Sequence, residues 1–251
     1  MRPNLIFAAW RAGKTALGAA VQINSPWLVE MCAAAGFDYV LLDCEHGAAG
    51  NGLPELIMAA EAAGVTPIVR TPDHGRASIL PALEAGAGGI WAPMVESAEQ
   101  ARQLVDEVKY APVGRRGFSL ATRAARYGSL TREEHVSGAN RETLLAVTIE
   151  TTAGVEQAGQ IAQVPGIDLL FVGRDDLAES LGARDRNDNA VDLALQRVSD
   201  AARGRIPVGT TAFAANDVVR WSPTPALFLT GTTGTIARAL AAAYRTLATG
   251  Q

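Results

Sequence analysis

The sequence predicts an α/β protein of the (β/α)8 TIM-barrel class, and three observations support this prediction. Eight short runs rich in β-branched and other apolar residues recur along the 251-residue chain. Alanine-rich stretches with helical spacing separate most of them, and such alternation is typical of parallel strands joined by crossover helices. The length also suits eight strand–helix units. An open doubly wound sheet shares this alternation and is the main alternative.

The expected elements follow one another at regular intervals. The strands are expected at LGAAVQ (17–22), FDYVLLD (37–43), VTPIVR (65–70), GGIWAPM (88–94), LLAVTIE (144–150), IDLLFVG (167–173), IPVGTT (206–211) and ALFLTG (226–231). The helices are expected at 51–63, 76–85, 97–109, 153–163, 190–203 and 233–248. The segment 111–141 has no evident strand and favours a substrate loop. No repeat or linker divides the chain, so residues 1–251 are expected to form a single domain.

Composition and charge limit the partners of the protein. Apolar residues make up 48% of the chain, enough for a large core. The 26 acidic residues outnumber the 22 basic ones, and no long basic run follows a phosphate backbone, so no nucleic-acid partner is expected. The apolar run 5–10 is too short for a signal sequence or a membrane span. Cys32 and Cys44 lack the spacing of a disulfide framework or zinc module, which favours a reducing cytoplasm.

Polar side chains stand where the expected strands end. The loops that leave the carboxyl ends of barrel strands surround one cavity, so residues at these ends are expected to lie together. Taken singly, each has a plainer interpretation as a solvated loop residue or a helix cap. The residues at these ends are Gln22, Asp43, Glu45, His46, Arg70, Glu150, Asp175 and Asp176.

Glu150 and Asp176 follow neighbouring strands and form a candidate metal site. Without a cation two converging carboxylates repel each other, whereas a hard divalent ion keeps both charged and leaves positions for water and substrate oxygens. No second histidine or cysteine accompanies them, which favours Mg²⁺, Mn²⁺ or Co²⁺ over zinc. The alternative is that Asp176 caps a helix while Glu150 pairs with an arginine.

Two further features suit a substrate carboxylate or an enolate oxygen. Arg70 closes its strand, and a guanidinium binds planar oxyanions through paired hydrogen bonds, although a structural salt bridge is the alternative. The backbone N–H groups that open a helix form a small anion site, and here that opening is Gly173, Arg174 and Asp175.

His46 is the candidate general base, because imidazole transfers protons near neutral pH, and Asp43 is expected to fix its tautomer. The other histidines, His74 and His135, are expected to be solvated. Imine chemistry is not expected, since neither of the two lysines closes a strand, and no G-x-S-x-G elbow indicates a serine hydrolase. Enolate chemistry assisted by a metal ion is the better interpretation of these residues.

Six stretches taken together resemble a known family. FDYVLLDCEHG, PIVR, AGAGGIWAPMVESAEQA, APVGRRGFS, VTIET and GIDLLFVGRDDLAESLG resemble, in order and spacing, the HpcH/HpaI family of class II pyruvate aldolases. That family includes hydroxy-oxo-heptanedioate aldolases and aldolases of keto-deoxy sugar acids. The resemblance implies a (β/α)8 barrel assembled as a trimer-based hexamer, with a divalent ion held by Glu150 and Asp176. It also implies that pyruvate binds this ion, with its oxygens on Arg70 and on backbone amides near Gly173.

The same resemblance implies a reaction. His46 is expected to move the pyruvate methyl proton through water, with Asp43 orienting it. Cleavage of a 4-hydroxy-2-oxo acid then releases pyruvate, or a substituted pyruvate, and an aldehyde. Oxaloacetate decarboxylation, a citrate-lyase-like reaction and a non-catalytic binding barrel are the alternatives.

Three positions depart from the family pattern. Glu84 stands where an aspartate from a neighbouring subunit often occurs, Thr148 where many members place a glutamine, and Arg174 where a proline is commoner. These departures bear on the acceptor and the proton relay. The arginines of the long connection are candidates for holding a carboxylated or hydroxylated acceptor, with surface charges or subunit contacts as the alternative: Arg115, Arg116, Arg123 and Arg126.

Overall fold

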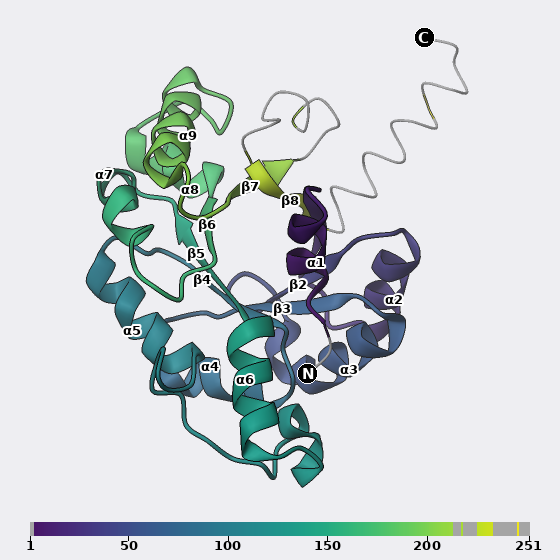
Figure 1. Cartoon of the computed structure of the whole chain (residues 1–251). Helices are drawn as coiled ribbons and strands as arrows, with labels where there is room; N and C mark the ends of the chain where they lie inside the picture. Colours follow the sequence, from purple (N-terminus) through teal and green to yellow (C-terminus); the bar gives the residue numbers. More distant parts are fainter. Residues whose placement is uncertain (1–2, 213–216, 218–224, 233–244, 246–251) are drawn as a thin grey trace.

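The computed structural model describes residues 3–212, 217, 225–232 and 245, and its strands form one curled parallel sheet (Figure 1). The strands are β1 (Ala16–Val21), β2 (Tyr39–Asp43), β3 (Thr66–Arg70), β4 (Gly89–Ala92), β5 (Leu144–Ile149), β6 (Leu169–Val172), β7 (Val208–Ala212) and β8 (Pro225–Thr232). They pair in chain order, and β1 pairs with both β2 and β8, so the sheet closes on itself.

The α/β class and the parallel strands are thereby confirmed, and each expected strand overlaps an observed one. The complete eightfold repeat of strand and helix is not established, because the segments that follow β7 and β8 fall largely outside the described residues. The helix expected at 233–248 lies there too.

Helices surround the sheet, with α2, α3, α4, α5 and α7 on its outside in Figure 1. The helices are α1 (Leu5–Arg11), α2 (Pro26–Ala34), α3 (Leu53–Ala63), α4 (Arg76–Glu84), α5 (Ala98–Val108), α6 (Arg132–Glu142), α7 (Thr152–Ile161), α8 (Arg174–Leu181) and α9 (Asn189–Ala202), with 3-10 turns η1 (Ala49–Gly52) and η2 (Arg123–Gly128). The expected helices within the described residues are confirmed. The expected helices did not include α1, α2 or α6. For α2 the sequence carries a common start signal, because Ser25 caps the helix and Pro26 opens it.

Alternation along each strand sorts the core into two layers. Tyr39 and Leu41 of β2 belong to a cluster inside the sheet, whereas Val40 and Leu42 pack outward against the helices. The next inward position on β2 is Asp43. The same two-residue step leads from the inner Leu144 and Ala146 of β5 to Thr148 and Glu150, and from Ile68 of β3 to Arg70. Strand periodicity therefore directs these polar residues into the mouth of the sheet.

The long connection between α5 and β5 lies at the opposite end of the sheet from that mouth. Lys109 donates to the carbonyl of Thr143, where β5 begins, and Arg123 donates to the carbonyl of Ala85, where α4 has ended. Helices that follow parallel strands end beside the strand starts, so these contacts place the segment at the amino-terminal edge. The expectation that 111–141 forms a substrate loop over the cavity of its own chain is wrong.

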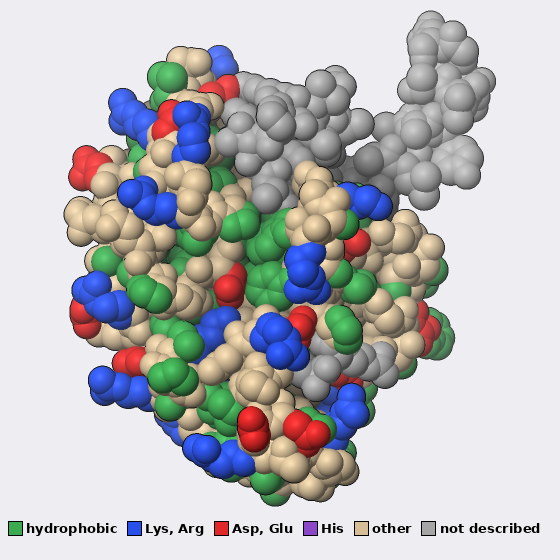
Figure 2. Space-filling model, in the orientation of Figure 1, with side chains coloured by type: hydrophobic (Ala, Val, Ile, Leu, Met, Phe, Trp, Pro, Cys, Tyr) green, Lys and Arg blue, Asp and Glu red, His purple; other side chains and the backbone are tan. Residues whose placement is uncertain are grey.

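No helix in the described part of the chain is long and apolar enough to cross a bilayer. On the face that Figure 2 presents, acidic and basic side chains are interspersed rather than gathered into a basic strip.

Candidate active site

A cavity of about 280 Å³ opens at the carboxyl ends of the strands. Its floor is formed by inner-layer residues such as Trp91 and Phe171, whose rings pack edge to face with centroids 4.4 Å apart. Most of the residues expected at the strand ends line its wall: Gln22, His46, Arg70, Glu150, Gly173, Arg174, Asp175 and Asp176. The sequence-based expectation that these residues lie together is therefore met.

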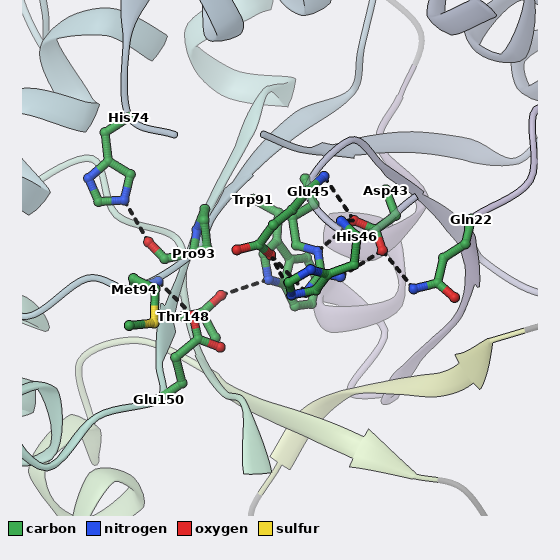
Figure 3. A network of polar contacts seen from close by, with 11 residues as sticks. Gln22, Asp43, Glu45, His46, His74, Trp91, Pro93, Met94, Thr148 and Glu150 are labelled. Carbon is green, nitrogen blue, oxygen red and sulfur yellow. Dashed lines mark hydrogen bonds and ion pairs between the residues drawn. The ribbon is translucent and has the colours of Figure 1, made fainter. Parts of the chain in front are cut away.

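Asp43 ends β2 as a fully buried carboxylate. Its oxygens accept hydrogen bonds from the Gln22 amide at 2.9 Å and from the backbone N–H groups of Glu45 and His46 at 3.1 Å, as Figure 3 shows. Arg70 adds two more, from Nε at 2.9 Å and Nη2 at 2.7 Å. Burial acts to raise the pKa of Asp43, but these donors, Arg70 first, hold that pKa below its ordinary value.

Arg70 connects two carboxylates. Besides the paired bonds to Asp43, its Nη1 lies 3.1 Å from Glu45 Oε2. Burial acts to lower the pKa of Arg70, yet the two acids hold it above its ordinary value, so the guanidinium stays charged. A guanidinium has five N–H donors, and these contacts with described residues use three of them. One N–H on each Nη is left for an oxygen in the cavity.

The His46 ring contacts Glu45 rather than Asp43. Its Nε2 lies 3.6 Å from Glu45 Oε2, and the His46 side chain is 58% exposed. Asp43 holds the backbone of His46 instead, because its oxygens are already taken by Arg70, Gln22 and two peptide groups. The predicted contact between Asp43 and the imidazole is thus wrong, and the acid beside the ring is Glu45, for which the sequence suggested no separate role.

Glu150 ends the β5 segment as a nearly buried carboxylate, 4% exposed. The backbone N–H of Met94 donates to its Oε1 at 2.6 Å (Figure 3), and Met94 adopts a left-handed φ of 52° to do so. The loop is held on its other side by His74, whose Nε2 donates to the Pro93 carbonyl at 2.6 Å. Burial raises the pKa of Glu150 to about 7, with further contributions from the charges of Asp176 and Glu45.

Gly173 lets α8 approach Glu150 closely. A Cβ atom at this position would lie 2.5 Å from Glu150 Oε2 and 3.1 Å from Thr148 Cγ2. Only glycine therefore fits between the carboxylate and the opening of α8. Asp176 lies in the first turn of that helix and lines the same cavity.

The two residues between Gly173 and Asp176 are already engaged. The Arg174 side chain is buried and donates from Nη2 to the Thr211 carbonyl at 3.0 Å. The Asp175 carboxylate pairs with Arg186 at 3.0 Å. Their backbone N–H groups lie at the start of α8 and remain available to the cavity. The geometry therefore supports an anion site made of backbone N–H groups rather than of these two side chains.

The other positions singled out from the sequence lie differently. Thr148 accepts a hydrogen bond from Trp91 Nε1 at 2.9 Å, so the departure at this position is part of the floor of the cavity. Glu84 ends α4 at the far edge, where its charge acts on Tyr110 and Arg116. His135 is buried and bonded to the Tyr110 hydroxyl at 3.0 Å, so the expectation that it is solvated is wrong.

The carboxylate oxygens of Glu150 and Asp176 suit a hard cation that also has ligands from outside the protein. No group of three or more His, Cys, Asp or Glu side chains among the described residues could hold an ion without help. Glu150 Oε2 and the Asp176 carboxylate offer oxygen ligands, which Mg²⁺ and Mn²⁺ prefer. Water and substrate oxygens would supply the remaining positions. The residues present fit a divalent ion on these terms.

Residues 18–221 match the HpcH/HpaI aldolase/citrate lyase family. The chain belongs to this family. It is 39% identical over 183 residues to a 4-hydroxy-2-oxovalerate aldolase of Novosphingobium aromaticivorans, a match that covers 71% of this chain and 68% of the relative. It is 34% identical over 200 residues to a 2-keto-3-deoxy-L-rhamnonate aldolase of Salmonella schwarzengrund, covering 78% and 72% of the two chains. The family assignment from sequence is therefore confirmed.

Solved structures agree with the fold. The HpcH/HpaI aldolase of Desulfitobacterium hafniense superposes with a TM-score of 0.86 at 29% identity, covering 96% of this chain and 95% of that one. A citrate lyase beta subunit of M. tuberculosis, complexed with oxaloacetate and magnesium, has a TM-score of 0.58 at 18% identity over 89% and 94% of the chains. That second likeness concerns the fold alone.

Proposed function

We propose that the protein is a divalent-metal-dependent aldolase that cleaves a 4-hydroxy-2-oxo acid into pyruvate, or a substituted pyruvate, and an aldehyde. The observation that carries the proposal is the buried Glu150 carboxylate, whose pKa is raised to about 7 in a cavity that Asp176 also lines. Such a carboxylate is costly without a cation, and a cation repays that cost. The names of the two aldolase relatives support the reaction class.

Glu150 and Asp176 would hold the ion, with Mg²⁺, Mn²⁺ or Co²⁺ as candidates. When bound there, a divalent ion supplies a Lewis acid that stabilises negative charge on the keto oxygen of the substrate. The acidic pair needs no further protein ligand if a 2-oxo acid contributes its own two oxygens.

The remaining residues of the wall bind the substrate and move its proton. Arg70 keeps N–H donors for an oxyanion, and its contacts with Asp43 and Glu45 fix the plane of the guanidinium. The backbone N–H groups at the start of α8, after Gly173, would bind the substrate carboxylate. His46, exposed at the mouth, would exchange a proton with the methyl carbon of pyruvate, directly or through water.

We expect a complete (β/α)8 barrel formed as a single domain from residues 1–251, with helices after β7 and β8. We also expect a cytoplasmic homo-oligomer, trimer-based by analogy with the family, that acts on small keto acids and aldehydes. Neither nucleic acid nor membrane is expected as a partner.

Exchange of the pyruvate methyl protons with solvent deuterium tests this function. Proton NMR of pyruvate in D₂O should show loss of the methyl signal with the protein and Mg²⁺, Mn²⁺ or Co²⁺, and no loss after chelation. Glu150→Ala should abolish exchange while circular dichroism still shows a folded protein. Full exchange by Glu150→Ala, or exchange that chelation does not affect, would overturn the proposal.

The same ion and base could also serve oxaloacetate decarboxylation, because loss of carbon dioxide leaves the same enolate. Pyruvate release from oxaloacetate and from 4-hydroxy-2-oxo acids, measured with one enzyme preparation, separates the two activities. A higher kcat/KM for the hydroxy-oxo acids is expected of an aldolase.

A further inference from the structure

Glu45 contacts two residues that line the cavity, Arg70 and His46, and so far only its contact with Arg70 has been given a task. Its carboxylate lies between the Arg70 guanidinium and the His46 imidazole, which becomes a cation when protonated. Glu45 Oε2 is 3.1 Å from Arg70 Nη1 and 3.6 Å from His46 Nε2. The side chain is only 18% exposed, so water screens these contacts less than it screens a surface pair. Figure 3 shows Glu45 and His46 close together beside Asp43.

Asp43 cannot perform the same task for the His46 ring. Within the described residues its two oxygens accept five hydrogen bonds, from Arg70 twice, from Gln22, and from the backbone of Glu45 and of His46. Two carboxylate oxygens offer about four lone-pair sites, so no acceptor is left for the imidazole. Asp43 orders the turn after β2, and the acid that faces the imidazole is Glu45.

We propose that Glu45 is the positioning residue for His46: its carboxylate holds the imidazole over the cavity and stabilises the imidazolium that forms when His46 takes a proton. This inference rests on the proposed function. In that step a methyl C–H bond of pyruvate breaks, the electron pair stays on the substrate, and the proton passes to the imidazole. His46 changes from neutral to positive beside a carboxylate that stays negative, which lowers the energy of the charged state.

Arg70 makes this arrangement rigid. It binds Asp43 through two nitrogens and Glu45 through a third, so the acid that orders the turn and the acid that faces the ring are fixed by one guanidinium. A guanidinium presents its donors in a fixed plane, so the direction of the Glu45 carboxylate follows from that of Asp43. In the D-x-E-H motif the first acid, Asp43, thus binds the backbone N–H groups of the turn, and the second acid, Glu45, lies beside the His46 ring.

A double-mutant cycle with deuterium exchange as the readout tests the proposal. Glu45→Gln keeps the shape and an acceptor for Arg70 but removes the charge beside His46. We expect it to lower kcat for exchange about tenfold while KM for pyruvate changes less than about twofold. In a His46→Ala background the same Glu45→Gln substitution should cause almost no further loss. Glu107→Gln, at another glutamate paired with an arginine, is the matched control and should exchange at the wild-type rate.

Crystals of Glu45→Gln supply a second measurement that does not depend on residual activity. The His46 ring should turn away from position 45 or lose its single orientation, while the Arg70–Asp43 pair stays. Equal losses in both backgrounds, a raised KM without a lower kcat, or an unmoved ring would overturn the role of Glu45. A wild-type protein that exchanges no protons with any divalent ion would instead overturn the proposed function and this inference together.

Discussion

The Arg70 guanidinium binds both oxygens of the buried Asp43 carboxylate, with Nε 2.9 Å from Oδ1 and Nη2 2.7 Å from Oδ2. Breaking such a pair leaves the other charge desolvated, which costs about 3 to 5 kcal/mol at buried sites. Because Arg70 keeps some exposure and its contact with Glu45, we expect Asp43→Asn to lower the free energy of unfolding by about 2 to 3 kcal/mol. Urea denaturation at neutral pH measures this change.

The Asp43–Arg70 pair should also make the stability of the protein depend on pH in the acid range. The pKa of Asp43 is held below its ordinary value, so its contribution to stability is present above the ordinary carboxyl range and is lost as pH falls through the folded pKa. The difference between wild type and Asp43→Asn should therefore shrink toward about pH 3. Asp106→Asn, at a surface pair with Arg115, is the control and should change stability by less than about 0.5 kcal/mol. A constant difference down to strong acid would contradict the assigned pairing.

The effect of Glu150 on stability should depend on pH in the opposite direction when a chelator keeps the protein free of metal. Burial, with the charges of Asp176 and Glu45, raises the pKa of Glu150 from its ordinary 4.5 to about 7, so the folded protein holds this proton more tightly than the unfolded chain. Stability without metal should fall as pH rises between these values. Glu150→Gln should be the more stable protein above neutral pH, by up to about 3 kcal/mol, and about equal to wild type near pH 4.

Urea denaturation of both proteins in chelator, at about pH 4 and about pH 8, measures the effect. Addition of Mn²⁺ at the higher pH should stabilise wild type and leave Glu150→Gln unchanged, because a ligand stabilises only the state that binds it. A wild-type protein that matches Glu150→Gln at both pH values in chelator would contradict the assignment of a costly buried charge.

Gly173→Ala tests the close approach between α8 and Glu150. The added Cβ would meet Glu150 Oε2 at 2.5 Å, so the carboxylate must shift. We expect Mn²⁺ affinity to fall at least tenfold, with exchange activity falling by a similar factor. Gly138→Ala, on α6 with nothing within 4 Å of its Cβ, is the control and should bind Mn²⁺ normally. Unchanged Mn²⁺ affinity in Gly173→Ala, measured by calorimetry, would show that Glu150 Oε2 is not a ligand.

Arg116 is a buried cation at the far end of the sheet. No nitrogen of its guanidinium has a hydrogen-bond partner among the described residues, and its Cζ lies 4.6 Å from the centre of the Tyr110 ring. Burial lowers the pKa of Arg116. Arg116→Met keeps the bulk over the ring and removes the unpaired charge, so we expect the free energy of unfolding to rise by about 1 to 3 kcal/mol.

Arg115→Met, at the exposed neighbouring position, should change stability by less than about 0.5 kcal/mol. Thermal unfolding of the two variants and wild type gives the comparison. A lower stability of Arg116→Met than of wild type would contradict the assignment of an unpaired buried charge at this position.

Periodicity was sufficient to predict most of the architecture. Apolar runs of strand length alternating with helical stretches gave each strand in its place. The two-residue step directed Arg70 and Glu150 to one cavity and Asp43 to a buried position against Arg70. The start of α2 at Ser25 and Pro26 was a signal that the sequence carries and the spacing missed. The position predicted for the connection 111–141 was wrong because its arginines suggested a substrate site. A segment that follows a crossover helix instead lies at the amino-terminal edge of the sheet, where the next parallel strand begins.

Side-chain pairing within the site was harder to predict. That Asp43 bonds to peptide groups two and three residues later is a local pattern of aspartate at turns and was open to prediction. Arg70 binds both oxygens of Asp43 and so leaves Glu45 to face His46. This pairing depends on the register between β2 and β3, which the spacing of residues along the chain does not reveal. The Met94 N–H on Glu150 likewise depends on a left-handed residue 56 positions away along the chain.

Diffraction from crystals soaked with Mn²⁺ and pyruvate tests the central claim most directly. Anomalous scattering should place one ion with oxygens of Glu150 and Asp176 at about 2.2 Å and two pyruvate oxygens on the same ion. An ion bound elsewhere, or pyruvate seated in the cavity without any ion between these two carboxylates, would contradict the account.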